Sequence, residues 1–135
     1  MNKTNPIGFF DSGIGGLTVV RSVTRLMPNE NIVYFGDTAR VPYGSKSNDT
    51  VVEYSLQAAN FLLRKNIKLL VVACNTASSV ALKELRKFLT IPVIGMIEPG
   101  AKMALQESRN GVVGVIGTRA TINNKAYAHE LKKLN

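Results

Sequence analysis

The chain has 135 residues, which is enough for one ordinary domain with a hydrophobic core. A hydrophobic share of 45% and a charged share of 19% exclude a disordered protein, and no apolar run is long enough to cross a bilayer. The 17 Lys and Arg residues against 9 Asp and Glu give a formal net charge of +8, but they form no basic run, so charge alone is weak support for nucleic-acid binding.

Cysteine and histidine usage limits the chemistry further. The only cysteine is Cys74, so the sequence predicts no internal disulfide and a reducing, cytoplasmic location. The only histidine, His129, is expected on the surface of a helix, which gives little support to Cys–His nucleophilic catalysis or to a protein metal site. Residues 1–6 do not have the pattern of a secretory signal, because the apolar segment after them ends at Asp11.

Short apolar runs predict five strands, each followed by a helical pattern. The predicted strands are residues 7–10, 32–36, 69–72, 92–96 and 112–117. The predicted helices run from about 17 to 27, 47 to 66, 75 to 89 and 99 to 108, and from 118 onward. Since parallel neighbours need helical crossovers, the alternation predicts an α/β fold: a three-layer, doubly wound, flavodoxin-like parallel sheet.

Helical spacing also predicts which residues are buried. In the first helix the residues spaced for one face are Leu17, Val20, Val23 or Thr24, and Met27. In the second helix the predicted buried stripe is Val52, Leu56, Ala59, Leu62 and Leu63, with Ser47, Asn48 or Asp49 as its cap.

Polar or glycine-rich segments follow four of the predicted strands, at residues 11–16, 37–44, 74–76 and 117–121. The carboxyl ends of parallel strands meet at one edge of a sheet, so these segments predict one shared polar pocket. Cys74 lies where a strand changes to a helix, and the first turn of a helix can stabilise a thiolate.

Each of these segments also has an ordinary structural interpretation. The glycines of residues 13–16 can serve a tight turn, and they do not complete a dinucleotide-binding G-x-G-x-x-G. Thr76 or Ser78 can cap a helix, and a turn explains residues 42–44. A lone cysteine beside valines, such as Cys74, can be a small buried hydrophobe.

Taken together, five segments resemble the signature segments of glutamate racemases, within the aspartate/glutamate racemase family. They are residues 10–19 (FDSGIGGLTV), 36–44 (GDTARVPYG), 72–77 (VACNTA), 91–95 (IPVIG) and 114–118 (GVIGT) with Thr121. Their order and spacing match the family across nearly the whole chain. The resemblance implies an enzyme without cofactor or metal that interconverts L- and D-glutamate and supplies D-glutamate for peptidoglycan.

The same resemblance implies roles for individual residues. Two cysteines flank the substrate α-carbon in this family, and Cys74 looks like the first of them. Asp11 and Ser12 match residues that hold the charged α-groups of the substrate. The other matched residues line the pocket or hydrogen-bond the carboxylates, and they are Pro42, Tyr43, Gly44, Asn75, Thr76, Thr118 and Thr121.

The chain departs from the family in its length. Family members are roughly twice as long, with two similar lobes and a second cysteine in a Gly-Cys-Thr-His segment that has no match here. The resemblance therefore predicts that residues 1–98 are the first lobe without its returning carboxyl-terminal segment, and that 99–135 begin an incomplete second lobe. We expect a truncated product, a fragment or half of a split enzyme, which forms a homo-oligomer or needs a complementing half and does not invert glutamate efficiently alone.

Two other functions stay open at this point. One is an aspartate-type racemase, although the Tyr-Gly loop at residues 43–44 matches the glutamate enzymes better. The other is a non-catalytic domain of the same fold that binds a small anion or a partner. Neither alternative predicts binding to nucleic acid or to a membrane.

Overall fold

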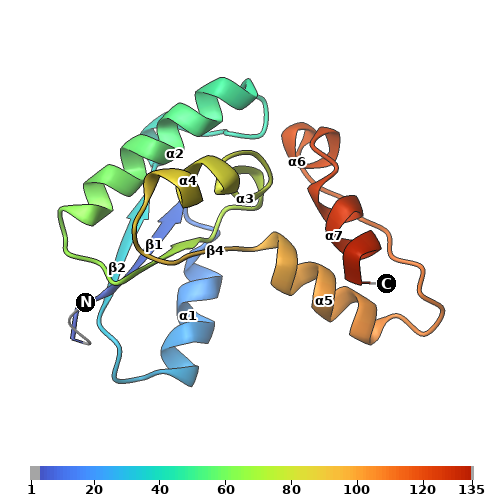
Figure 1. Cartoon of the computed structure of the whole chain (residues 1–135), viewed down its shortest axis with the longest axis horizontal. Coiled ribbons are helices and arrows are strands. Elements are labelled where there is room, and N and C mark those ends of the chain that lie inside the picture. The colour runs from blue at the N-terminus through green and yellow to red at the C-terminus, as the bar shows by residue number, and fades with distance from the viewer. Residues whose placement is uncertain (1–3, 135) are drawn as a thin grey trace.

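A computed structural model of the chain describes residues 4–134 (Figure 1). Residues 1–3 and 135 lie outside the described residues. The interpretation of the amino terminus as non-secretory and the outer limits of the two predicted lobes fall partly on them.

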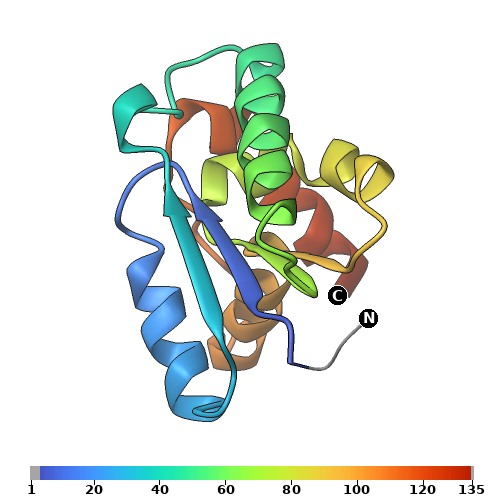
Figure 2. The same ribbon diagram turned by 90° about the vertical axis from the view of Figure 1, so that its left-hand side faces the viewer.

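The centre of the fold is a parallel sheet with the strand order β2-β1-β3-β4. Its strands are β1 (Ile7–Asp11), β2 (Ile32–Gly36), β3 (Leu69–Val72) and β4 (Val93–Gly95). Figure 2 views the sheet from the β2 edge, with β1 beside it. The inner strands β1 and β3 are continuous apolar runs because helices cover both of their faces. The predicted α/β class with a parallel sheet is confirmed.

Helices cover the two faces of the sheet unequally. Helix α1 (Leu17–Leu26) lies on one face, and the opposite face carries α2 (Asn48–Leu63), α3 (Asn75–Val80) and α4 (Leu82–Phe88) (Figure 1). The larger core lies under α2 to α4, and its fully buried side chains include Phe10, Leu62, Leu70 and Leu85. The smaller core under α1 is built on Ile7, Phe9 and Val71.

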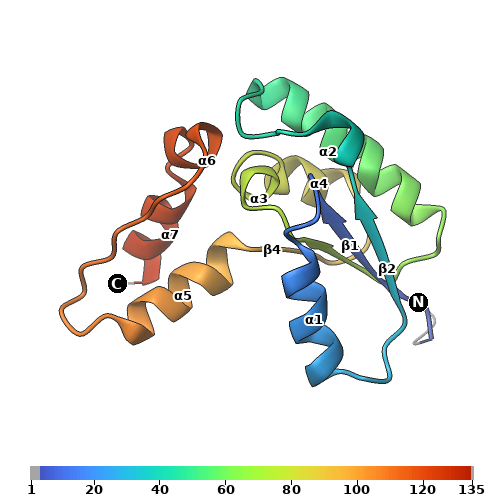
Figure 3. The same cartoon turned by 180° about the vertical axis from the view of Figure 1, so that it is seen from behind.

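The last part of the chain extends away from β4 and then returns. Helix α5 (Ile97–Glu107) leaves the sheet, α7 (Ala126–Leu134) packs along α5, and α6 (Arg119–Asn123) contacts α3 (Figures 1 and 3). A short 3-10 helix, η1 (Thr38–Arg40), follows β2. Within residues 4–134, no helix is both long and apolar enough to span a bilayer.

The fifth predicted strand is wrong. Residues 112–117 form no strand, and the side chains of Val112 and Ile116 are 75% and 99% exposed. An apolar extended segment becomes a strand only when a neighbouring strand accepts and donates its backbone hydrogen bonds. The sheet of the described residues consists of β1 to β4, and residues 112–117 pair with none of these strands.

Several predicted helix limits also need correction. The predicted helix over 75–89 is two helices that change direction at Ala81, which stays fully buried. The predicted helix from 118 onward is likewise divided, into α6 and α7, near Lys125 with its φ of 53°. Helix α5 starts at Ile97 rather than Pro99, and the proline is accommodated in the first turn, where amides need no helical partner.

The buried stripe of α2 is rotated from the predicted one. Its buried residues are Val51, Ser55, Ala58, Ala59 and Leu62, whereas the predicted Val52, Leu56 and Leu63 are only partly buried. Small side chains at positions 55, 58 and 59 allow the helix to approach the sheet closely. The hydroxyl of Ser55 donates to the Val51 carbonyl at 2.6 Å, so its burial leaves no polar atom unpaired. Ser47 is the cap, and its Oγ accepts from the Thr50 amide.

Candidate active site

Cys74 is separated from β3 by the single residue Ala73 and is itself the N-cap of α3. Its backbone is extended, and its Sγ accepts the Ala77 amide at 3.4 Å. The interpretation of Thr76 or Ser78 as the cap is therefore wrong, because both residues lie inside α3. The thiol is in this way held at the point where the first-turn amides of α3 begin.

The end of β1 brings two predicted residues to the thiol, because β1 and β3 are neighbours in the sheet. The Ser12 Oγ lies 3.3 Å from the Cys74 Sγ. Asp11 is buried, and its Oδ2 accepts the Gly16 amide at 2.8 Å. Gly16 approaches so closely that an added Cβ would lie 2.8 Å from the Cβ of Ala73. A glycine is therefore required there for the loop to close against the sheet.

A pocket of about 830 Å³ opens over Cys74. Four other predicted site residues line it: Asp11, Asn75, Thr76 and Thr118. Its remaining walls come mainly from α1 and from the start of α5, including Val19, Met96 and Met103. The polar segments after β1 and β3 thus meet around a single hollow, as the strand-end argument predicts. Residues 117–121 reach it without following a strand, and residues 37–44 do not line it, so the prediction is correct for two of the four segments.

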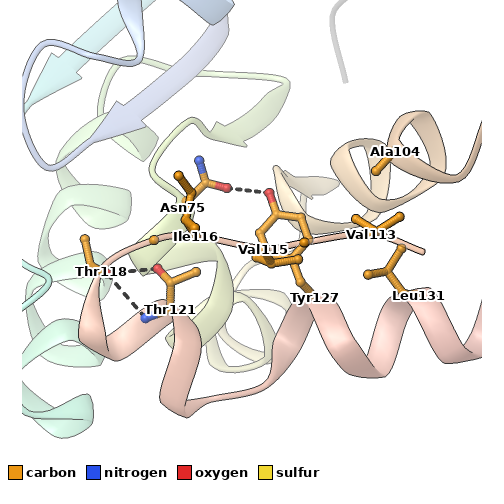
Figure 4. Close-up of a pocket in the computed structure, with 11 residues that line it drawn as sticks. Asn75, Ala104, Val113, Val115, Ile116, Thr118, Thr121, Tyr127 and Leu131 are labelled. Carbon is orange, nitrogen blue, oxygen red and sulfur yellow. Dashed lines mark hydrogen bonds between the residues drawn. The ribbon is translucent and has the colours of Figure 1, made fainter. Parts of the chain in front are cut away.

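Three threonine hydroxyls meet beside this pocket, where α3 contacts α6. The Oγ1 of Thr118 lies 2.9 Å from that of Thr76 and 2.9 Å from that of Thr121. Thr118 is also the N-cap of α6, since its Oγ1 accepts the Thr121 amide at 3.3 Å (Figure 4). The cluster therefore fastens the returning chain to α3 at the site.

A second pocket, of about 440 Å³, adjoins the first and is shown in Figure 4. The two pockets share Asn75, Thr118 and Tyr127. The Tyr127 hydroxyl donates to the Asn75 Oδ1 at 2.7 Å, and burial raises the pKa of this phenol. Tyr127 was not among the predicted site residues, because a single tyrosine in an amphipathic helix carries no sequence signal for a site.

The loop after β2 is organised around Asp37, which lies in the interior. Asp37 Oδ2 accepts from the Arg40 Nε at 2.7 Å and from the Tyr43 hydroxyl at 2.5 Å. Burial, and then the hydrogen bond to Asp37, raise the pKa of Tyr43. The Tyr43 ring packs against Phe10 with centroids 6.1 Å apart. This phenol is thus directed at a core carboxylate.

Residues 42–44, which were expected at the substrate pocket, do not line the pocket over Cys74. Tyr43 is 1% exposed, Pro42 lies on the surface, and neither lines the pocket over Cys74. Gly44 touches the site indirectly, since its position is packed against the Thr118 side chain. The substrate contacts expected for these three residues stay predictions.

Among the residues that the structure describes, neither the histidine nor a metal-ligand cluster adds to this site. His129 is exposed on α7, as expected for a surface residue. In the described part of the chain, no three His, Cys, Asp or Glu side chains are grouped as metal ligands would be.

An α/β sheet with a thiol and hydrogen-bonding side chains at its carboxyl edge defines a class of small-molecule binding or catalytic domains. Residues 15–135 match the Asp/Glu/Hydantoin racemase family, and the chain belongs to that family. The resemblance drawn from the sequence motifs is thus confirmed at the level of the family.

Two of the curated relatives that it matches are named glutamate racemases. The protein of Geobacter metallireducens is 58% identical over 129 residues, which are 96% of this chain and 48% of the relative. The protein of Aquifex aeolicus is 55% identical over 127 residues, which are 94% of this chain and 50% of the relative. The chain therefore spans about half the length of the curated relatives it matches.

Solved structures give the same result. The glutamate racemase of Aquifex pyrophilus superposes with a TM-score of 0.92 at 53% identity, over 95% of this chain and 51% of that one. The Francisella tularensis enzyme, solved in complex with D-glutamate, superposes with a TM-score of 0.90 at 45% identity, over 98% of this chain and 49% of that one.

Proposed function

We propose that this chain supplies one thiol of a cofactor-independent glutamate racemase, with Cys74 as the group that exchanges a proton with the substrate α-carbon. The observation that carries the proposal is the 3.3 Å contact between Cys74 Sγ and Ser12 Oγ, at a pocket lined by Asp11 and Thr118. Membership of the racemase family and the D-glutamate bound by the Francisella relative support the substrate class.

The proposed reaction is a proton transfer in two halves. In one direction the Cys74 thiolate takes the α-proton of glutamate, and the C–H electron pair moves into the α-carboxylate. Because an α-proton is a very weak acid, that developing charge needs hydrogen-bond donors in a site shielded from water. The side chains of Asn75, Thr76 and Thr118 are the proposed donors, together with the Thr121 hydroxyl behind them.

Inversion requires a second proton donor on the opposite face of the α-carbon. Cys74 is the only cysteine of the sequence, so within this proposal the second thiol comes from polypeptide outside these 135 residues. In the same proposal residues 1–98 belong to the first lobe and 99–135 to the start of the second. The enzyme acts in the cytoplasm and supplies D-glutamate for peptidoglycan.

A one-sided exchange experiment tests the proposal. The purified chain is incubated in D₂O with L-glutamate or with D-glutamate, and loss of the α-proton signal is followed by ¹H NMR. A thiol on one face can exchange the α-proton of only one enantiomer, so we expect slow, configuration-retaining exchange of one and none of the other. Cys74→Ser should abolish this exchange, because the sequence has no other thiol to replace it.

Each remaining outcome decides between functions. Rapid formation of D-glutamate from L-glutamate by this chain alone would contradict the need for a second thiol. Equal exchange of both enantiomers, or exchange that survives Cys74→Ser, would contradict the role of Cys74. Glutamate binding without any exchange, unchanged by Cys74→Ser, would favour a non-catalytic anion-binding domain. The same assay with aspartate separates the glutamate-type from the aspartate-type racemase.

A further inference from the structure

The loop that carries Ser12 is fastened by a residue of the neighbouring strand. Tyr34 lies in β2, paired with Phe9 of β1, and its ring packs in the smaller core beside α1. Its hydroxyl lies 2.8 Å from the Gly13 carbonyl oxygen, to which it donates, and 3.2 Å from the Asp11 Oδ2. One phenol thus contacts the residues on both sides of Ser12.

The second fastening of the same loop runs through Asp11. Its Oδ2 accepts the Gly16 amide at 2.8 Å as well as facing the Tyr34 hydroxyl. The loop from Asp11 to Gly16 is therefore closed at both ends, and Ser12 is directed at the Cys74 Sγ from within it. Burial, and then the charge of Asp11, raise the pKa of Tyr34, so the phenol remains a donor at neutral pH.

We propose that Tyr34 is a positioning residue, which holds the Ser12 hydroxyl against the Cys74 sulfur. Tyr34 is not among the residues that line the pocket over Cys74, so it acts through the loop that it holds at Asp11 and Gly13, which carries Ser12. A hydroxyl held in place donates to the thiolate form of Cys74 and favours it. The inference rests on the proposed function only for the catalytic role of Cys74.

The test measures Cys74 alkylation by iodoacetamide as a function of pH, using the whole chain. Because Cys74 is the only thiol, the reagent reports on this site alone. Ser12→Ala should move the midpoint of the pH–rate profile upward by about 0.7 pH unit, the loss expected for one hydrogen bond. Below the midpoint the rate should fall about two- to threefold, since a more basic thiolate is also more nucleophilic.

Tyr34→Phe removes only the hydroxyl, and we expect it to reproduce most of the Ser12→Ala shift. In the double variant the Tyr34→Phe effect should vanish, because the hydroxyl it positions is absent. Tyr54→Phe is the matched control, since its ring lies against Tyr43 and Arg40 rather than the Ser12 loop. A Tyr34→Phe profile equal to wild type, or a shift that adds fully to that of Ser12→Ala, would overturn the proposal.

A second substitution separates positioning from folding. Tyr34→4-aminophenylalanine keeps an N–H donor at the same place on the ring, and we expect it to restore the wild-type profile. A profile shifted as far as that of Ser12→Ala would overturn the proposal even if Tyr34→Phe fails to fold. The alkylation assay needs no turnover of glutamate, so its failure and the failure of the proposed function are distinguishable.

Discussion

The hydroxyl oxygens of Thr76 and Thr118 lie 2.9 Å apart, although 42 positions separate them in the sequence. Thr76 belongs to α3, two positions after Cys74, and Thr118 caps α6. This contact joins the sheet-bound part of the chain to its returning helices at the edge of the candidate site. Its loss should therefore change the attachment of α6 more than the core.

Thr76→Val replaces the hydroxyl by a methyl group of nearly the same size. We expect the free energy of unfolding to fall by about 1 kcal/mol, because a partly buried hydrogen bond is lost. Amide hydrogen exchange in α6 should become faster, while β1 and β3 keep their protection. The exposed Thr90 provides the control Thr90→Val. Unchanged exchange in α6 would show that the threonine contact does not hold it.

Gly44→Ala tests the close packing of the loop after β2 against Thr118. An added Cβ would lie 2.5 Å from the Thr118 Cβ, so the loop or α6 must move. We expect destabilisation of about 1–3 kcal/mol, measured by urea unfolding. Gly114→Ala is the matched control, since an added Cβ there has no neighbour within 4 Å. Equal stability of the two variants would contradict this packing.

The phenol of Tyr43 predicts a loss of stability in alkaline solution. Burial and Asp37 raise its pKa above the ordinary 10.0, so the unfolded chain releases this proton first as the pH rises. The contribution of the Tyr43 phenol to the free energy of unfolding is therefore complete below about pH 10 and decreases above it. Urea unfolding at about pH 8 to 11 should show a steeper alkaline decline for the wild type than for Tyr43→Phe. Tyr54→Phe is the control, and its alkaline decline in stability should match that of the wild type. Equal declines for the wild type and Tyr43→Phe would contradict this account.

Residues 112–117 should behave as an unpaired segment in the isolated chain. Their amides form no part of the sheet, and Ile116 is 99% exposed. We expect these amides to exchange with solvent far faster than those of β3, as measured by hydrogen exchange and mass spectrometry. Protection equal to that of β3 would show that the segment forms a strand after all.

The sequence was sufficient to locate the four strands of the sheet. Buried parallel strands are continuous apolar runs bounded by turns, and residues 69–72 are the clearest example. The same pattern failed at 112–117, because an apolar run says nothing about whether a partner strand lies beside it. The rotation of the buried stripe of α2 was missed because a hydrophobic pattern gives no weight to small residues such as Ser55 and Ala58.

The candidate site was predictable where it depends on topology. Asp11 ends β1 and Cys74 comes shortly after the neighbouring parallel strand β3, so the sheet alone brings them together. Tyr34 was not predictable, because an aromatic residue inside a strand is typical of a core position and its hydroxyl matters only through the register of β2 on β1. The direction of the Tyr43 phenol was likewise set by Asp37, a contact that no local pattern encodes.

One buried hydroxyl has an effect beyond its own surroundings. The Ser78 Oγ donates to the Val72 carbonyl at 2.9 Å and accepts the Met96 amide at 3.0 Å. Met96 is the residue between β4 and α5, so this hydroxyl ties α3 to the point at which the chain leaves the sheet. Helix α7 packs along α5, and its Tyr127 returns to hydrogen-bond Asn75 of α3. Asn75 and Tyr127 line the pocket over Cys74 and Ser78 does not, so Ser78 is connected to that pocket only through the backbone that it holds.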